Sequence, residues 1–330
     1  MSSATSIALP DPALAGGQFR FTAMASQVSI QTAAEPTSPL QAANPAAFHA
    51  VADLFAGVEA ECTRFKAESA LMRANAAGDS WAEVPAYCYA AIASAAQAHR
   101  ETAGLFDPRI LNTLQRLGYD RSFPGPGSDQ PLAGVLEDQP GPIRSGWQPD
   151  FDEAGSRVRI GPEPIDLGGI GKGLAVRWAV PLLRAGYRSF LIEAGGDCYL
   201  AGSGPAGNGW QVAIEDPAGG SDPVAVLNLS DRACATSSTR LRSWTASGQR
   251  VHHLIDPRTG RPGSGGLTAV TVIADDPAWA EVWSKSLFLL GRDGIAGAAA
   301  AHALAAIWIG EDGGLDCSAA AEPLICWRAR

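Results

Sequence analysis

The stretch that decides the fold runs from Asp166 to Asp197 and reads DLGGIGKGLAVRWAVPLLRAGYRSFLIEAGGD. Three glycines among its first six residues predict a turn, and apolar residues then recur at helical spacing over 176–183. We expect a helix here, with Gly186 as its C-cap. The sequence 189–194 predicts a short buried strand, and the two glycines after it predict a turn with Asp197 at the tip.

The glycine turn predicts an anion-binding site. Backbone N–H groups at the start of a helix have no partner within the helix and lie at the positive end of its dipole. Asp166 adds a carboxylate and Lys172 a cation within reach of the same turn. The glycines also fit a tight turn without a ligand, and on spacing alone the two interpretations carry about equal weight. The order G-G-x-G-x-G matches neither a Walker loop nor a clear Rossmann fingerprint.

Length and composition limit the class of protein. The chain has 330 residues, 46% of them apolar, which is enough to bury a sizeable core of one or two domains. Its net charge of -9 argues against nucleic acid as a main partner. The sequence contains no run of about eighteen apolar residues that could span a membrane, and its N terminus lacks the features of a signal peptide. We therefore expect a flexible leader over 1–18, a single domain over 19–330 and a cytoplasmic location.

The order of the predicted elements is typical of an α+β fold, because helices dominate the first third of the chain and strands dominate afterwards. We expect a surface loop, with the highest mobility of the chain, over the Gly- and Pro-rich segment 122–142. The expected helices cover 45–61, 69–74 with an end at Asn75, 85–102, 110–117, 278–290 with an end at Gly291, and 294–304. The expected strands lie within 18–32 and at 158–160, 210–215, 224–229, 232–236, 267–274, 306–309 and 324–327.

Two further groups of polar residues suggest chemistry. His253 lies near a turn acid, Asp256, and could act as a general base, although for an isolated histidine a structural hydrogen-bonding role is favoured by about two to one. Asp166, Asp197 and Glu281 are candidate oxygen ligands for Mg²⁺. The two aspartates equally suit turns, and Glu281 suits a solvated helix face. Together these residues favour phosphoryl chemistry on a nucleotide.

Five blocks of sequence resemble, in order and spacing, the FAD:protein FMN transferases, which are the ApbE-type flavin transferases. The blocks are D-L-G-G-I-x-K-G-x-A, A-G-G-D, A-T-S, H-x-I-D-P-R-T-G-x-P and the helix pattern A-[acid]-x-x-x-x-x-L-F-x-L-G. An M-x-S at Met24, the segment from Arg64 to Asn75 and the G-L-F-D-P that begins at Gly104 are similar to the opening blocks of that family. The resemblance extends from about Phe19 to Ile309. It implies the ApbE-type fold, in which mixed sheets are flanked by helices.

The resemblance also implies an activity. Members of the family bind FAD and, with Mg²⁺, move its FMN half onto a Thr hydroxyl of a target protein while releasing AMP. The partners implied are therefore FAD and an acceptor protein with a Thr flavinylation motif. His253 would take part in the transfer, and the Gly169 carbonyl and Glu281 would hold the metal. The implied FAD site consists of Met24, Phe65, Leu105, Phe106, Asp107, Asp166, Lys172 and Ile255.

The chain departs from the family pattern at the metal helix. The family usually reads A-D-A-x-x-T there, with the Asp and the Thr as Mg²⁺ ligands, whereas this chain places Glu281 and Lys285 at those two positions. A protonated lysine cannot be a ligand, and its charge repels a cation. Its ammonium could instead hold the pyrophosphate directly. Two smaller departures are Phe65, where the family often has Tyr, and Arg109, where it usually has Thr.

Three functions follow from this comparison of residues. The first is the flavin transferase. The second is a non-catalytic FAD-binding protein on the same scaffold, with the metal site altered by Lys285. The third is hydrolysis of FAD to FMN and AMP. The pair Glu281 and Lys285 discriminates between the first two functions, and AMP release without an acceptor protein would mark the third.

Overall fold

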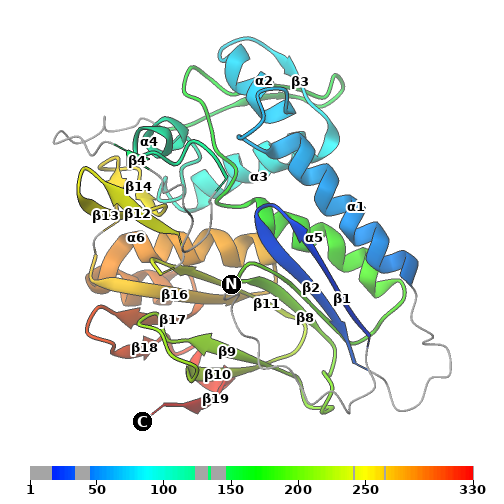
Figure 1. Ribbon diagram of the computed structural model, residues 1–330, viewed down its shortest axis with the longest axis vertical. Coiled ribbons are helices and arrows are strands. Elements are labelled where there is room, and N and C mark those ends of the chain that lie inside the picture. The colour runs from blue at the N-terminus through cyan, green and yellow to red at the C-terminus, as the bar shows by residue number, and fades with distance from the viewer. Residues whose placement is uncertain are drawn as a thin grey trace.

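A central sheet of eight strands organises the fold, in the order β1-β2-β7-β8-β11-β16-β17-β18. The computed structural model describes residues 17–33, 45–122, 133–134, 146–240, 242–263 and 265–329. Helices cover one face of the central sheet, and a three-stranded sheet covers the other (Figure 1). This arrangement confirms the predicted α+β class.

Neighbouring strands of the central sheet are antiparallel throughout. Both β7 and β8 are buried along their whole length, because side chains on both faces of the sheet are covered. The strands of this sheet are β1 (Gln18–Ala23), β2 (Ser26–Thr32), β7 (Phe190–Ala194), β8 (Asp197–Ala201), β11 (Arg232–Ser238), β16 (Leu267–Ala274), β17 (Ala305–Gly310) and β18 (Leu315–Cys317). The covering sheet contains β9 (Trp210–Glu215), β10 (Pro223–Leu229) and β19 (Ile325–Arg328).

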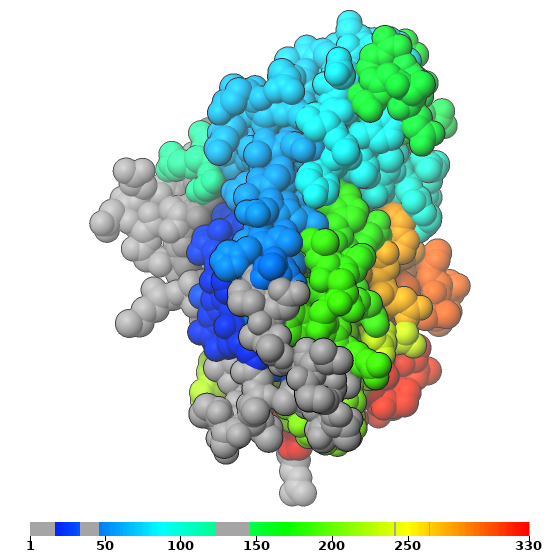
Figure 2. Space-filling model, turned by 90° about the vertical axis from the view of Figure 1, so that its right-hand side faces the viewer, coloured from blue at the N-terminus to red at the C-terminus, as the bar shows by residue number. Residues whose placement is uncertain are grey.

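Three helices form the layer on the other face. They are α1 (Pro45–Cys62), α5 (Gly171–Arg184) and α6 (Pro277–Ala301). Helix α6 packs on β11 and β16, α5 packs on β7 and β8, and α1 packs on α5. From the side, the three helices appear as adjoining blue, green and orange bands (Figure 2). The glycine-rich start of α5 therefore lies between two helices and against the central sheet.

Most of the remaining elements are short and lie at one end of this layered core, whereas the 3-10 helix that contains residues 322–324 contacts β10 of the covering sheet (Figure 1). A separate hydrophobic group, which we call the Trp244 cluster, consists of Leu114, Leu117, Tyr119, Trp244, Ala246, Val251 and Ile255. The short helices and the longer α3 are α2 (Ala70–Ala77), α3 (Ala86–Glu101), α4 (Leu111–Arg116) and the 3-10 helix η1 (Glu322–Leu324). The short strands are β3 (Ala82–Glu83), β4 (Ala133–Gly134), β5 (Asp150–Asp152), β6 (Arg157–Arg159), β12 (Ser243–Ala246), β13 (Gln249–His252), β14 (Ile255–Asp256) and β15 (Arg261–Pro262).

Most of the predicted elements are confirmed, but several helix ends differ from the prediction by one to three residues. The helix expected over 294–304, for example, is the last part of α6 and ends at Ala301. Helix α2 continues to Ala77 instead of ending at Asn75, because the Asn75 side chain bonds Ile165 and does not cap the helix. Helix α5 ends at Arg184 with Ala185 as its C-cap. A bond from the Gly186 N–H to a carbonyl three residues earlier tightens this end, so no left-handed glycine cap is needed.

The expected turn acid also differs. Gly195 and Gly196, with φ of 59° and 97°, make the whole two-residue turn. Asp197 is the first residue of β8, pairs with Ala194 and is buried. It therefore faces the interior and does not stand at the tip of a turn.

Parts of the predicted leader and loop lie outside the described residues. Residues 1–16 of the expected leader are among them, and Gln18 already begins β1. Of the expected loop 122–142, the structure describes Ser122 and the strand β4. Within the described ranges, no helix combines the length and the apolar character that a membrane crossing requires.

Candidate active site

One cavity collects the residues predicted to bind FAD. All eight line it, and so do Gly169, His253 and Lys285. Its volume is about 1230 Å³, counting the part that opens to solvent. The α1 end, the β1–β2 turn, the glycine turn of α5 and the Trp244 cluster each supply part of the wall.

The β1–β2 turn positions Met24 at one side of the cavity. Met24 and Ala25 both have positive φ, 52° and 54°, as a tight two-residue hairpin turn requires. The Met24 N–H donates to the Glu59 Oε2 of α1 at 2.9 Å, which fixes the turn against that helix. A Cβ on Gly171 would lie only 3.2 Å from the Met24 Cε. The Met24 side chain therefore packs on the glycine turn.

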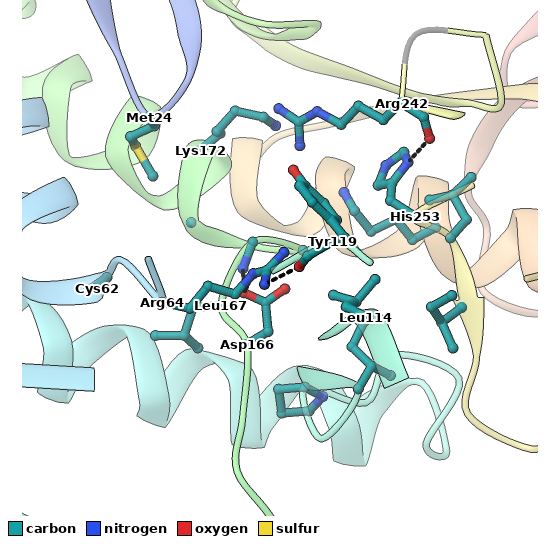
Figure 3. Close-up of a pocket in the computed structure, with 18 of the residues that line it drawn as sticks. Met24, Cys62, Arg64, Leu114, Tyr119, Asp166, Leu167, Lys172, Arg242 and His253 are labelled. Carbon is teal, nitrogen blue, oxygen red and sulfur yellow. Dashed lines mark hydrogen bonds and ion pairs between the residues drawn. The ribbon is translucent and has the colours of Figure 1, made fainter. Parts of the chain in front are cut away.

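Arg64 lies in the wall next to Phe65. Its guanidinium carbon lies 4.3 Å from the centre of the Phe65 ring and 4.4 Å from the centre of the Tyr119 ring. Its Nη1 donates to the Tyr119 carbonyl at 2.6 Å, and its Nε lies 3.5 Å from Asp166 Oδ1 (Figure 3). Among the described residues, the buried Nη2 has no hydrogen-bond partner. This donor is available to an acceptor that comes from outside the protein.

Asp107 lines the cavity, but its carboxylate is engaged elsewhere. Arg109 donates to Asp107 Oδ1 from its Nε at 3.0 Å and to Oδ2 from its Nη2 at 2.8 Å. Arg109 also reaches Glu163 Oε2 at 3.0 Å. The arginine that stands where the family usually has Thr therefore holds the Asp107 side chain in a bidentate pair inside the protein.

The glycine turn at the start of α5 binds a carboxylate of the chain itself. Glu281, on α6, accepts a hydrogen bond from the Gly173 N–H through its Oε2 at 2.8 Å. A Cβ at Gly173 would lie 2.7 Å from Ala278 Cα, so only glycine allows α5 and α6 to approach this closely. The Gly173 N–H at this helix start is therefore engaged by a carboxylate of the chain itself, Glu281.

Two lysines share this carboxylate. Glu281 is 0% exposed, and its Oε1 accepts from Lys172 Nζ at 3.0 Å and from Lys285 Nζ at 3.1 Å. Lys172 Nζ also donates to Asp197 Oδ2. Burial alone would raise the pKa of Glu281, but the two ammonium groups and the Gly173 N–H lower the pKa to about 2. The alternative interpretation of Glu281, as part of a solvated helix face, is therefore wrong.

In the neighbouring acids, burial outweighs the opposing interactions, so the net pKa shift is opposite to that of Glu281. Burial is the largest cause that raises the pKa of Asp197 to about 6, and repulsion by Glu281 adds to it. Burial likewise raises the pKa of Glu193 to about 7. Desolvation also lowers the pKa of Lys285 below its ordinary value. The interior around α5 and α6 thus holds several ionisable groups that depend on one another for their charge.

His253 lies at the other side of the cavity. Its Nδ1 is 3.4 Å from the Arg242 carbonyl oxygen, so Nδ1 carries the hydrogen and Nε2 keeps a lone pair (Figure 3). Burial lowers the pKa of His253 well below its ordinary value, and the positive charges of Arg242 and Lys285 lower it further. The imidazole is therefore neutral at neutral pH. By contrast, both ring nitrogens of His252 are engaged, with Gly263 and Leu254.

A second cavity meets the first at a cationic junction. Five residues line both cavities, namely Gly168, Lys172, Arg242, His253 and Lys285. The side chains of Arg242 and Lys172 extend toward each other (Figure 3). The second cavity then continues along β9 and β11, where hydroxyl residues such as Thr236, Ser237 and Ser238 form part of its wall. We use the term cationic junction for Lys172, Arg242 and Lys285 together.

The residues present do not fit a divalent metal. Both Glu281 oxygens are engaged by donors, and two of those donors are ammonium groups. Within the described part of the chain, no three His, Cys, Asp or Glu side chains are grouped as a metal site. Magnesium prefers a set of oxygen ligands that includes carboxylates and water. At the position where Mg²⁺ would need oxygen ligands, the pairing of Glu281 with Lys285 places an ammonium group instead.

The structure adds residues that sequence reasoning missed. Tyr119 and Arg64 form one wall of the first cavity, and Arg242 belongs to the cationic junction. The signal for Arg64 was its position beside Phe65 in a recognised block. No local pattern marks Tyr119 or Arg242. Tyr119 belongs to the Trp244 cluster, and Arg242 directly precedes β12.

The fold and the site together define an α+β protein with a cavity lined by aromatic and charged side chains, in which cations gather beside a neutral histidine. A sequence model of the ApbE family matches residues 24–308. The chain belongs to the ApbE family.

Named relatives support the same assignment. The chain is 33% identical to the FAD:protein FMN transferase of Salmonella typhimurium over 129 residues, which are 38% of this chain and 37% of that protein. It is 29% identical to the FAD:protein FMN transferase of Treponema pallidum over 240 residues, 68% of this chain and 66% of that protein. The alignment with the Salmonella protein thus spans well under half of either chain.

Solved structures share the fold. The ApbE protein of Thermotoga maritima has a TM-score of 0.77 at 24% identity, with 94% of this chain and 99% of that chain covered. The flavin transferase ApbE of Vibrio cholerae has a TM-score of 0.74 at 21% identity, with 94% and 100% covered. These likenesses extend over nearly the whole chain and confirm the ApbE-type fold.

Proposed function

We propose that this chain binds FAD in the first cavity and transfers the FMN half to a Thr hydroxyl of an acceptor protein, with release of AMP. The observation that carries the proposal is that Lys172, Arg242 and His253 line both cavities. The first cavity would hold the dinucleotide, and the second would give the acceptor a separate route to the same point. Clustered cations at that point suit a diphosphate.

The wall of the first cavity supports FAD as the ligand. Phe65 and Phe106 offer aromatic faces, and Arg64 Nη2 is a buried donor without a protein partner. A flavin or an adenine offers both a flat ring and acceptor atoms. Lys172 adds positive charge next to the glycine turn. These contacts require no rearrangement of the Asp107 carboxylate, which stays paired with Arg109.

The reaction consists of one exchange of P–O bonds. The acceptor Thr oxygen attacks the phosphorus on the FMN side and forms a new P–O bond. The bond from that phosphorus to the bridging oxygen breaks, and AMP leaves with this oxygen. The Thr proton moves to His253 Nε2, which holds a lone pair because Nδ1 faces the Arg242 carbonyl.

The cations act on the charge that develops in this exchange. Lys172 and Arg242 neutralise the phosphate oxygens and the leaving AMP. A bound diphosphate also offsets the positive charges that lower the pKa of His253, so ligand binding makes this histidine a better proton acceptor.

A non-catalytic FAD-binding protein is the second candidate, and one observation favours it. Lys172 and Lys285 both donate hydrogen bonds to Glu281 Oε1, and Glu281 is the residue that would be a metal ligand in a transferase. Hydrolysis of FAD to FMN and AMP is the third candidate and differs only in that water replaces the Thr hydroxyl.

The test is AMP release from FAD, measured with and without an acceptor protein that carries a Thr flavinylation motif. We expect AMP release, together with a covalently flavinylated acceptor, only when FAD and the acceptor protein are both present. Release of AMP without the acceptor would establish the hydrolase, and tight FAD binding without any AMP would establish the binding protein.

Substitution of the histidine sharpens this test. We expect His253→Ala to reduce the transfer rate roughly 10²–10⁴-fold, the usual contribution of a general base, with little effect on FAD affinity. His302→Ala is the matched control, because His302 is exposed and lines neither cavity. Equal rates for the two variants would remove His253 from the mechanism. We also propose a cytoplasmic location for the protein.

A further inference from the structure

The two oxygens of Glu281 are already engaged within the protein. Oε2 accepts from the Gly173 N–H, and Oε1 accepts from two ammonium groups at 3.0 and 3.1 Å. A Mg²⁺ ion bound to Oε1 would lie about 2 Å from it. The ion would then be at most about 5 Å from the Lys285 ammonium, and the buried surroundings of Glu281 screen the repulsion between the two charges only weakly. In this chain Glu281 therefore pairs with lysine ammonium groups and not with a metal ion.

Lys285 also fills the space between the two predicted metal ligands. A Cβ on Gly169 would lie 3.6 Å from Lys285 Cδ and 3.7 Å from Cε, so the lysine stem lies directly against that glycine. The end of the same side chain reaches Glu281. Lys285 thus extends from Gly169 to Glu281, across the position that a shared cation would have to occupy.

The charges around this point do not cancel. Lys172, Lys285 and Arg242 carry three positive charges, whereas Glu281 and Asp197 supply two carboxylates. Among the described residues, no ion pair engages the Arg242 guanidinium. Both Arg242 and Lys285 line both cavities. The cationic junction therefore has positive charge available to an anionic ligand.

We infer that the Lys285 ammonium replaces the divalent cation in this chain, so that the site binds the diphosphate of its nucleotide without metal. The inference rests on the proposed function for the identity of the nucleotide. Lys285 Nζ donates one charge-assisted hydrogen bond to a diphosphate oxygen and keeps another to Glu281 Oε1. Lys172 and Arg242 neutralise the remaining phosphate charge.

The first test uses the wild-type protein. FAD binding is followed by flavin fluorescence after treatment with EDTA, and again after Mg²⁺ is added. We expect the Kd to agree within about twofold. Electron paramagnetic resonance of Mn²⁺ gives an independent reading, and the signal of free Mn²⁺ should persist when protein and FAD are both present. A Kd that falls about tenfold with Mg²⁺, or loss of the free Mn²⁺ signal, would overturn the inference.

The second test removes the ammonium. Lys285→Met keeps much of the aliphatic stem, and Glu281 retains Lys172 as a partner. We expect the Kd for FAD to rise at least about tenfold, as for the loss of a hydrogen bond to a charged group. Lys285→Arg should recover most of this affinity because it restores the charge. Lys66→Met is the matched control, since Lys66 is exposed and lines neither cavity.

The third test rebuilds a metal site. The double variant Glu281→Asp with Lys285→Thr should bind Mn²⁺ in the presence of FAD and should require a divalent cation for tight FAD binding. Failure to gain any metal dependence, while the variant still folds, would show that Lys285 is not what excludes the cation. If Lys285→Met does not fold, the wild-type measurements with EDTA and Mn²⁺ decide the question alone.

The outcomes separate this inference from the proposed function. If the wild-type protein binds FAD only with Mg²⁺, the inference fails and the transferase proposal stands. If it binds FAD neither with EDTA nor with Mg²⁺, the proposed function fails. Binding of FAD in EDTA without any AMP release upholds the inference and establishes the second candidate function.

Discussion

Glu281 is a fully buried carboxylate whose partners are two lysines and a backbone N–H. Glu281→Gln would leave two buried ammonium groups with a neutral amide between them. Removal of one member of a buried charge group typically costs about 3–5 kcal/mol. We therefore expect Glu281→Gln to lower the free energy of unfolding by about this amount, measured by urea denaturation.

A surface carboxylate provides the comparison for this prediction. Asp150 pairs with Arg159 at 2.6 Å, but the Asp150 side chain is 54% exposed. Exposed pairs contribute roughly 0–1 kcal/mol. Asp150→Asn should therefore change the unfolding free energy by less than about 1 kcal/mol. Similar losses for the two variants would contradict the buried charge group described here.

Glu193 predicts a pH dependence of stability. This residue of β7 has a pKa of about 7, because burial raises it above its ordinary value and outweighs the Gly196 N–H. The charged groups that face it are Asp197 and Lys172. In the unfolded chain Glu193 ionises near its ordinary pKa, whereas in the folded chain it stays protonated up to about pH 7. The stability that Glu193 contributes is therefore lost as the pH rises from about 4.5 to 7.

The measurement compares Glu193→Gln with the wild-type protein by urea denaturation at several pH values. The variant cannot ionise, so its stability relative to the wild type should increase by on the order of 1–3 kcal/mol between pH 4.5 and 8. The difference also removes the contribution of the histidines, which is common to both proteins. A difference that stays constant with pH would show that Glu193 is ionised in the folded protein throughout.

At the residue scale, the sequence predicted which residues would line the same cavity but not the hydrogen-bond partners of some of their side chains. Met24, Phe65, Asp166 and Ile255 were found from recognised blocks, and all line one cavity. Asp107 was predicted in the same way, yet its carboxylate faces Arg109. Hydrogen-bond partners depend on side-chain directions that spacing does not fix.

Helix α6 contains a kink whose position depends on one close backbone approach. Gly291 has φ of 71°, and a Cβ there would lie 2.8 Å from Gly265 Cα. The Arg292 N–H donates to the Gly265 carbonyl at 2.8 Å. We expect Gly291→Ala to lower the melting temperature and to cost about 1–3 kcal/mol, because both the left-handed backbone and the contact exclude a methyl group.

The same helix offers a control for this substitution. Gly297 is exposed, and a Cβ there would meet nothing within 4 Å. Gly297→Ala should therefore stabilise the protein by up to about 1 kcal/mol through helix propensity. Thermal denaturation of the two variants should show shifts of opposite sign. A stabilising effect of Gly291→Ala would contradict the described kink.

At the element scale, long periodic segments were predictable and short strands were not. Gly291 was correctly expected to interrupt the helical pattern, because a glycine there divides two apolar stretches. The strands β12 to β15 have two to four residues each, which is too short for a period to be recognised. They are held by tertiary contacts such as the bond from Trp244 Nε1 to the Leu117 carbonyl at 2.6 Å.

Across the whole molecule, the cavity lies between a large core and a small one. The Trp244 cluster is separate from the main core, yet it carries Tyr119 and Ile255 to the cavity wall. Small clusters on short strands open at lower free energy than strands inside a large sheet. We expect backbone amides of β12 and β13 to exchange with deuterium faster than those of β16.

Binding of FAD should change this pattern, because the ligand would contact both cores at once. Exchange in β12 and β13 should slow when FAD is bound, while β16 should change little, since its amides already exchange only through global opening. Mass spectrometry of deuterium uptake provides the measurement. FAD binding without any change in β12 and β13 would place the ligand away from the Trp244 cluster.

At this largest scale, the sequence predicted the fold class and not the sheet order. The antiparallel pairing of β2 with β7 joins segments about 160 residues apart, such as Ser29 and Glu193. No local pattern specifies such a partner, because alternation sets which face of a strand is buried but not which strand lies beside it. The resemblance to a known family supplied what periodicity could not.

The shared carboxylate also constrains how such a site can change during evolution. If position 281 mutates first, two ammonium groups lose their common partner and the protein loses stability. If position 285 mutates first, Glu281 keeps Lys172 and the Gly173 N–H, so the intermediate retains a balanced interior. A viable path between an ammonium site and a metal site therefore passes through position 285 before position 281.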